Sequence, residues 1–167
     1  MTISRKKEGR RMDKNEFGRK CEKTGTAGDF IKKVLTLSPE DNLLDALRLM
    51  HRYFYSQIPV YRGKVFTGLL TEGRILGWIT ENQLDGKIDL SRVRIHEVLA
   101  FGEEKENYGF LKEEASLFEI LDLFNRFEKE GKVLESVLIT KNGTQNEQVI
   151  GIITVWDLFL LKEPLCV

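Results

Sequence analysis

Thr154 and Asp157 have the side-chain types and the spacing that could hold a nucleoside. They follow an apolar run, Gly151 to Ile153, which predicts the end of a buried strand and the start of a helix. A threonine at a helix start can cap the helix, and the free backbone N–H groups of the first turn make that end weakly positive. An aspartate three residues later lies on nearly the same face. Its carboxylate could accept two hydrogen bonds from the cis-diol of a ribose.

The same spacing also has a purely structural interpretation. A capping residue followed three positions later by an acid is an ordinary helix-start signature, favoured by the helix dipole. A single occurrence does not choose between the two interpretations, whereas repetition of the motif at the same place in a duplicated unit favours binding. Trp156 lies between the two residues and could stack on a base. Its offset of two positions from Thr154 favours a direction away from the site, into a dimer contact or helix packing.

A duplicated pattern positions these residues. The segment 43–50 (LLDALRLM) recurs 74 positions later as 117–124 (LFEILDLF), and both have the apolar spacing of a helix that buries one face. The segment 68–75 (GLLTEGRI) recurs 83 positions later as 151–158 (GIITVWDL). The offset grows because the second copy has longer loops, notably the polar residues 141–148.

Each half therefore predicts the order strand, helix, strand, strand, helix. The expected ranges are 34–37, 43–52, 58–61, 65–70 and 71–82, then 108–111, 116–130, 136–140, 149–153 and 154–161. A short amphipathic piece precedes each half, at 27–31 and 95–99. The segment that starts at Gly77 (GWITENQ) resembles the repeated motif, but Gly68 stands where the strand-ending glycine should, so we place Gly77 inside a helix.

The expected fold class is α/β (α+β), with two pseudo-symmetric β-α-β-β-α repeats packed sheet to sheet. Neither half, at roughly 60 to 70 residues, buries enough surface to be stable alone. Two packed copies would enclose two equivalent clefts, where small ligands tend to bind. The expected organisation is a basic tail (1–23), repeat 1 (24–84), a linker (85–93) and repeat 2 (94–167).

The double unit resembles a tandem pair of cystathionine-beta-synthase (CBS) domains, also called a Bateman module. The resemblance covers residues 26–162 and rests on the segments 38–47 (SPEDNLLDAL), 56–61 (SQIPVY), 68–71 (GLLT) and 151–158 (GIITVWDL). It implies two clefts that bind adenosine-containing ligands such as AMP, ADP, ATP, S-adenosylmethionine or cyclic di-AMP. It also implies a homodimer of modules and regulation of a partner protein.

The resemblance assigns roles to individual residues. In the family's pattern the threonine and the acid meet phosphate and ribose, and Thr154 and Asp157 fit that pattern. The strand residues that border the adenine map to Ser56, Gln57 and Ile58 in the first copy and to Glu135, Ser136 and Val137 in the second.

The first copy departs from the family's pattern. Thr71 is present, but Arg74 stands where the acid should. A guanidinium has donors and no acceptor, so it cannot receive ribose hydroxyls and suits a phosphate or carboxylate instead. The second copy lacks the proline, with Val137 expected at the position of Pro59. We therefore expect unequal clefts, the one at Asp157 being the better nucleoside site.

Composition narrows the possible partners. The 26 basic and 26 acidic residues cancel, so no global field attracts nucleic acid or an anionic membrane. Residues 1–23 carry nine basic side chains against four acidic ones, which predicts a solvated tail, with a nucleic-acid or acidic-partner arm as the alternative. A translation start at Met12 is a further hypothesis, because Lys6 to Arg11 can be encoded entirely by purine codons, as a ribosome-binding site would be.

No motif indicates catalysis or a resident metal. Cys21, Cys166, His51 and His96 lack metal-ligand spacing, and no nucleophile elbow or phosphate-binding glycine loop is present. Without a signal-peptide pattern or a membrane-length apolar run, we expect a cytoplasmic protein.

The sequence thus predicts a stand-alone, non-enzymatic sensor that needs no cofactor. It would bind an adenosine-containing regulatory ligand and signal to an unidentified partner protein. The alternative is a structural or nucleic-acid-associated dimer that uses the basic tail and has vestigial clefts.

Overall fold

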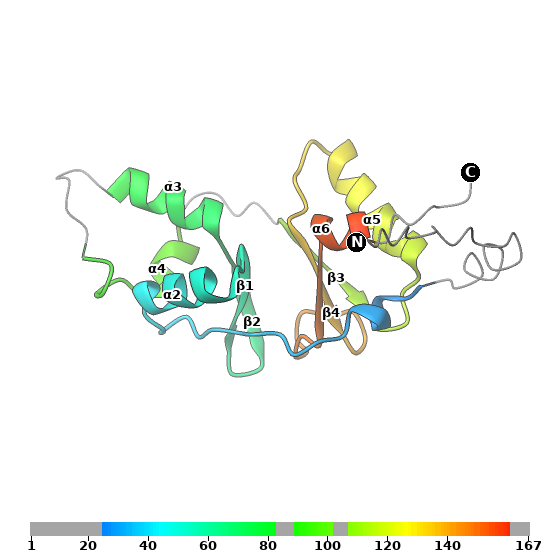
Figure 1. Ribbon diagram of the computed structural model, residues 1–167, viewed down its shortest axis with the longest axis horizontal. Coiled ribbons are helices and arrows are strands. Elements are labelled where there is room, and N and C mark those ends of the chain that lie inside the picture. Colours follow the sequence, from blue (N-terminus) through cyan, green and yellow to red (C-terminus); the bar gives the residue numbers. More distant parts are fainter. Residues whose placement is uncertain (1–24, 83–88, 102–106, 161–167) are drawn as a thin grey trace, which may run out of the picture.

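The computed structural model describes residues 25–82, 89–101 and 107–160 (Figure 1). The basic tail, both cysteines and much of the expected linker lie outside the described residues. The first half contains α2 (Leu43–Tyr53), β1 (Gln57–Arg62), β2 (Val65–Thr71) and α3 (Glu72–Asn82). The second contains β3 (Tyr108–Lys112), α5 (Leu117–Lys129), β4 (Ser136–Thr140), β5 (Gly151–Thr154) and α6 (Val155–Leu160). A 3₁₀ helix, η1 (Ala27–Phe30), and a short helix, α4 (Ile95–Leu99), match the two expected amphipathic pieces.

Local capping signals explain where α2 and α5 begin. The Asn42 side chain accepts hydrogen bonds from the backbone N–H groups of Leu44 and Asp45 at the start of α2. Ser116 and Glu119 form a reciprocal capping box at the start of α5. Gly77 lies inside α3, as expected.

The first strand of the first half is the main departure from the expected order. Residues 34–37 were expected to form a strand, but Leu37 makes only an isolated parallel bridge to Val60. The corresponding β3 of the second half is a full strand parallel to β4. The reason is that the backbone N–H of Lys32 donates a hydrogen bond to Ile150 O of the other half. Residues 31–37, called the crossing segment below, therefore pass from one sheet to the other instead of following β1.

The two sheets face each other across a shared core. Tyr61, Phe66 and Leu69 of the first half pack with Leu138 and Val149 of the second. The helices lie on the outer sides of the sheets, where each half has a core of its own (Figure 1). This arrangement confirms two repeats packed sheet to sheet.

Each of the short helices η1 and α4 precedes one half in sequence and is hydrogen-bonded to the other half, an arrangement called their exchange below. The backbone N–H of Ala27 in η1 donates to Ala115 O of the second half at 2.7 Å, although η1 precedes the first half in sequence. In return, Ile95 of α4 donates to Asp41 O of the first half at 3.1 Å. The chain from η1 therefore runs from one half to the other along the edge of both sheets (Figure 1).

Strand register fixes which residues of the two halves are equivalent. In the first half Gln57 pairs with Thr71, and in the second half Ser136 pairs with Thr154 at the equivalent place. Two residues further along these strands, Pro59 pairs with Leu69 and Leu138 pairs with Ile152. Leu138, not Val137, therefore stands at the position of Pro59, and the sequence expectation is wrong by one residue. Val137 instead packs in the core of its own half, as Ile58 does in the first.

Among the described residues, no helix has the length and apolar character needed to cross a bilayer.

Candidate functional site

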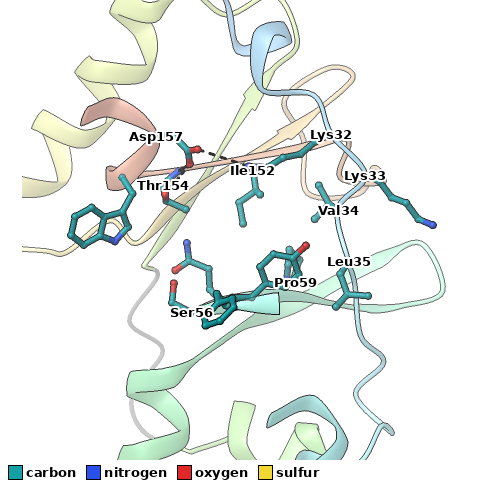
Figure 2. Close-up of a pocket in the computed structure, with 13 residues that line it drawn as sticks. Lys32, Lys33, Val34, Leu35, Ser56, Pro59, Ile152, Thr154 and Asp157 are labelled. Carbon is teal, nitrogen blue, oxygen red and sulfur yellow. Dashed lines mark hydrogen bonds and ion pairs between the residues drawn. The ribbon is translucent and has the colours of Figure 1, made fainter. Parts of the chain in front are cut away.

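A cavity of about 320 Å³ lies between the two halves, beside the crossing segment (Figure 2). Its volume is at the lower end of the range typical of small-molecule sites. Its walls combine apolar, polar, aromatic and charged side chains from both repeats. The lining residues are Lys32, Lys33, Val34, Leu35, Phe54, Tyr55, Ser56, Gln57, Pro59, Ile152, Thr154, Trp156 and Asp157.

The two oxygens of Asp157 have different surroundings. Oδ2 accepts hydrogen bonds from both the backbone N–H and the hydroxyl of Thr154, each at 2.8 Å. Oδ1 lies 3.8 Å from Lys32 Nζ, which is longer than a direct hydrogen bond (Figure 2). The helix-start interpretation of this pair is therefore confirmed. It leaves Oδ1 able to accept hydrogen bonds from a ligand.

Lys32 was not singled out from the sequence. Its backbone N–H donates to Ile150 O at 3.2 Å, and the preceding residue, Ile31, forms a bridge with Gly151. These contacts hold the backbone of Lys32 beside the first residue of β5, and the long side chain reaches from there to Asp157 in the first turn of α6. The only sequence signal for Lys32 was the pair of lysines that follows residues 27–31. That pair could be assigned to the site only once η1 was known to pack on the second half.

Four of the ten residues expected to bind ligand meet at this cavity. Thr154 and Asp157 come from the second half, and Ser56 and Gln57 come from the first. Gln57 also links the halves, because its side-chain amide donates to Glu135 O at 3.4 Å.

The remaining expected residues lie elsewhere. Thr71 is 3% exposed, and Arg74 donates hydrogen bonds to the carbonyls of Leu99 and Phe101 at 2.8 and 3.5 Å. Arg74 thus stabilises the end of α4, where a cation complements the helix dipole. The others that do not line the cavity are Ile58, Glu135, Ser136 and Val137.

Three of these four are almost fully buried. Ile58, Ser136 and Val137 are at most 1% exposed. The hydroxyl of Ser136 has no hydrogen-bond partner among the described residues. Glu135 is partly buried, and its backbone N–H donates to Asn107 O at 2.7 Å.

Trp156 lies at the cavity rather than away from it. Trp156 is 75% exposed and lines the cavity with Phe54 and Tyr55, so the expected direction away from the site is wrong. Side chains in a helix lean toward the N-terminus, which directs a residue in the first turn of α6 back over the helix start.

The described residues contain no group of three or more histidine, cysteine or acidic side chains that could hold a metal ion. The described lining residues bring neither histidine nor cysteine to the cavity.

A family model described as the CBS domain matches residues 27–81 and 105–162. A CBS domain-containing protein from Kribbella flavida shares 15% identity, a TM-score of 0.61 and coverage of 82% of this chain and 97% of its own. The CBS domain pair of protein MJ0100, solved with 5′-methylthioadenosine and S-adenosyl-L-methionine, shares 15% identity, a TM-score of 0.60 and coverage of 83% and 95%. CBSX2, solved with AMP, shares 16% identity, a TM-score of 0.57 and coverage of 81% and 94%. At these identities the likeness shows the fold alone, and no curated protein matches the chain.

Proposed function

The chain belongs to the CBS domain family, and on that premise we propose that it is a regulatory sensor that binds an adenosine-containing ligand between its two repeats. The observation that carries the proposal is the convergence of Thr154 and Asp157 from one repeat with Ser56 and Gln57 from the other around one cavity. Structural neighbours solved with AMP or with S-adenosylmethionine support the ligand class.

The cavity suggests how such a ligand would be held. The ribose hydroxyls would donate to Oδ1 of Asp157, the carboxylate oxygen that does not cap α6. The adenine would lie among the apolar side chains Val34, Pro59 and Ile152. The Gln57 amide, which also lines the cavity, can both donate and accept hydrogen bonds with the base.

Binding would report to a partner protein through the packing of the two repeats. A ligand in this cavity would contact both halves and the crossing segment at once. It can shift an equilibrium between two packings only by its differential affinity for them. We propose that a homodimer of modules transmits this shift to the regulated protein and that the chain itself catalyses no reaction.

A thermal-shift panel tests the proposed function. We expect at least one of AMP, ADP, ATP, S-adenosylmethionine and cyclic di-AMP to stabilise the protein, by about 2.7 kcal/mol at 100 times its dissociation constant. A protein that responds to none of the five would instead fit a structural dimer with vestigial clefts.

The stoichiometry of the responding ligand is a separate prediction. Because Thr71 is buried and Arg74 is bonded to the end of α4, we expect calorimetric titration to saturate at one ligand per chain. Saturation at two ligands per chain would show that a second ligand also binds beside Thr71. Arg74→Ala should not change the affinity of the single site.

Phe54 provides a prediction that separates binding from stability. It ends α2 with φ 56° and ψ 40°, a left-handed conformation that favours glycine, and its side chain is 93% exposed. We expect Phe54→Gly to raise the free energy of unfolding by up to about 1 kcal/mol, because the strain is relieved and little burial is lost. Its ring lines the cavity, so the same variant should bind the ligand more weakly.

Chemical denaturation and calorimetric titration measure the two effects of Phe54→Gly. Phe118→Ala is the control, since Phe118 is also an exposed aromatic residue, at 77%, and does not line the cavity. It should leave the affinity unchanged. A Phe54→Gly protein that is less stable than wild type, or that binds as tightly, would contradict the prediction.

A further inference from the structure

The charges around the cavity do not match those of the whole module. Residues 24–167 contain 17 basic and 22 acidic side chains. The described residues that line the cavity include two lysines, Lys32 and Lys33, and a single acid, Asp157. The cavity is therefore locally positive within an acidic module. A small ligand in it would be influenced mainly by these nearby charges, because more distant ones are screened by salt.

Lys32 is placed to respond to ligand binding at Asp157. Its Nζ lies 3.8 Å from Asp157 Oδ1, the oxygen that the proposed function assigns to the ribose hydroxyls. A ribose bound there would compete with Lys32 for this oxygen. The ammonium released from Asp157 would then be free to pair with a 5′-phosphate on the same ribose.

Lys33 adds a second positive charge on the outer side of the cavity. Its side chain is exposed and points away from Asp157 (Figure 2). A long ammonium side chain at this place could reach phosphates beyond the first. The two consecutive lysines thus lie along one side of the cavity, and only Lys32 is paired with the acid.

We propose that this cavity selects adenosine ligands with negative charge at the 5′ position and rejects S-adenosylmethionine, with Lys32 as the selecting residue. The inference rests on the proposed function. In S-adenosylmethionine a positively charged sulfonium is attached at the 5′ carbon, where AMP has its phosphate. The same ribose position would therefore bring a cation, not an anion, next to Lys32. The fold alone does not make this choice, since structural neighbours were solved with either class of ligand.

Calorimetric titration of the full chain with adenosine, AMP, ATP and S-adenosylmethionine tests the proposal. We expect AMP and ATP to bind about tenfold or more tightly than adenosine, because charge-assisted hydrogen bonds are roughly twice as strong as neutral ones. S-adenosylmethionine should bind more weakly than adenosine. The preference for AMP over adenosine should shrink at high salt, since Lys32 is 53% exposed.

Variants assign the preference to Lys32. Lys32→Gln should reduce AMP affinity about tenfold and leave adenosine affinity unchanged or higher, because Asp157 is released. Lys33→Gln should affect ATP more than AMP. Lys64→Gln is the matched control, since Lys64 is an exposed lysine in the turn between β1 and β2 and does not line the cavity. It should change none of the affinities.

The outcomes separate this inference from the proposed function. If S-adenosylmethionine binds wild type as tightly as AMP, or if Lys32→Gln keeps the full preference for AMP, charge selection by Lys32 is overturned while the nucleoside site stands. If none of the four ligands binds, the inference fails, and the proposed function fails with it when ADP and cyclic di-AMP do not bind either.

Discussion

Asp157→Ala is expected to weaken nucleotide binding by about 100-fold or more. The variant removes the carboxylate oxygen assigned to the two ribose hydroxyls. Hydrogen bonds to a charged acceptor contribute about 1.5 to 3 kcal/mol each, so losing two is enough for this effect. Calorimetric titration with AMP measures the change directly.

Asp157 also caps α6, so its removal costs stability as well as binding. Glu119→Ala is the matched control for that second effect. Glu119 caps α5 in the same way, accepting hydrogen bonds from the backbone N–H and the hydroxyl of Ser116 at 2.8 and 2.9 Å. These bonds, led by the one from the backbone, lower the pKa of Glu119, and its side chain does not line the cavity.

We therefore expect Glu119→Ala to be mildly destabilised and to bind AMP like wild type. Equal losses of binding in both variants would mean that a weakened helix start, not a lost ribose contact, explains the effect. Unchanged AMP affinity in Asp157→Ala would refute the assignment of the ribose.

Gly151→Ala is expected to destabilise the protein by about 1 to 3 kcal/mol, the usual range for overpacking. A Cβ at this position would lie 2.8 Å from Phe30 O and 2.9 Å from Ile139 Cδ1. The first contact is backbone, so the segment that follows η1 would have to move away from β5. Lys32 is the second residue after Phe30, and AMP affinity should fall for that reason too.

Gly73→Ala is the control for this prediction, with an expected change of opposite sign. The nearest atom to a Cβ at Gly73 is Thr71 Oγ1 at 4.0 Å, and the residue lies in α3. Alanine is the better helix former, so the free energy of unfolding should rise by up to about 1 kcal/mol. Denaturant unfolding compares the two variants. A Gly151→Ala protein as stable as wild type would show that the crossing segment is not held tightly against β5.

The order of elements was predictable because its signals are local. Helices α2 and α5 are fixed to within a few residues by the apolar spacing at 43–50 and 117–124 and by the caps at Asn42 and Ser116. The exchange of η1 and α4 was not predictable, since it depends on hydrogen bonds between residues far apart in sequence, such as Ala27 with Ala115. Packing between the halves likewise determines three further features that the sequence did not predict. These are the absence of a strand at 34–37, the register of Leu138 and the position of Lys32.

The candidate site was predictable in part. One cavity is lined by four of the residues that the repeat and the family resemblance indicated, namely Thr154, Asp157, Ser56 and Gln57. Their equivalents in the other copy, Thr71 and Arg74 among them, do not line it, and Arg74 is hydrogen-bonded to the end of α4. The direction of Trp156 was missed, because the rotation of a short helix relative to a neighbouring repeat is not visible in the spacing of its own residues.

A crystal structure of the full chain with AMP tests the central claim most directly. The proposed site predicts one AMP per chain between the repeats. Its ribose hydroxyls should lie within hydrogen-bond distance of Asp157 Oδ1, and its phosphate should lie beside Lys32. AMP bound instead at Thr71 and Arg74, or a cavity that stays empty in crystals grown at saturating AMP, would contradict it.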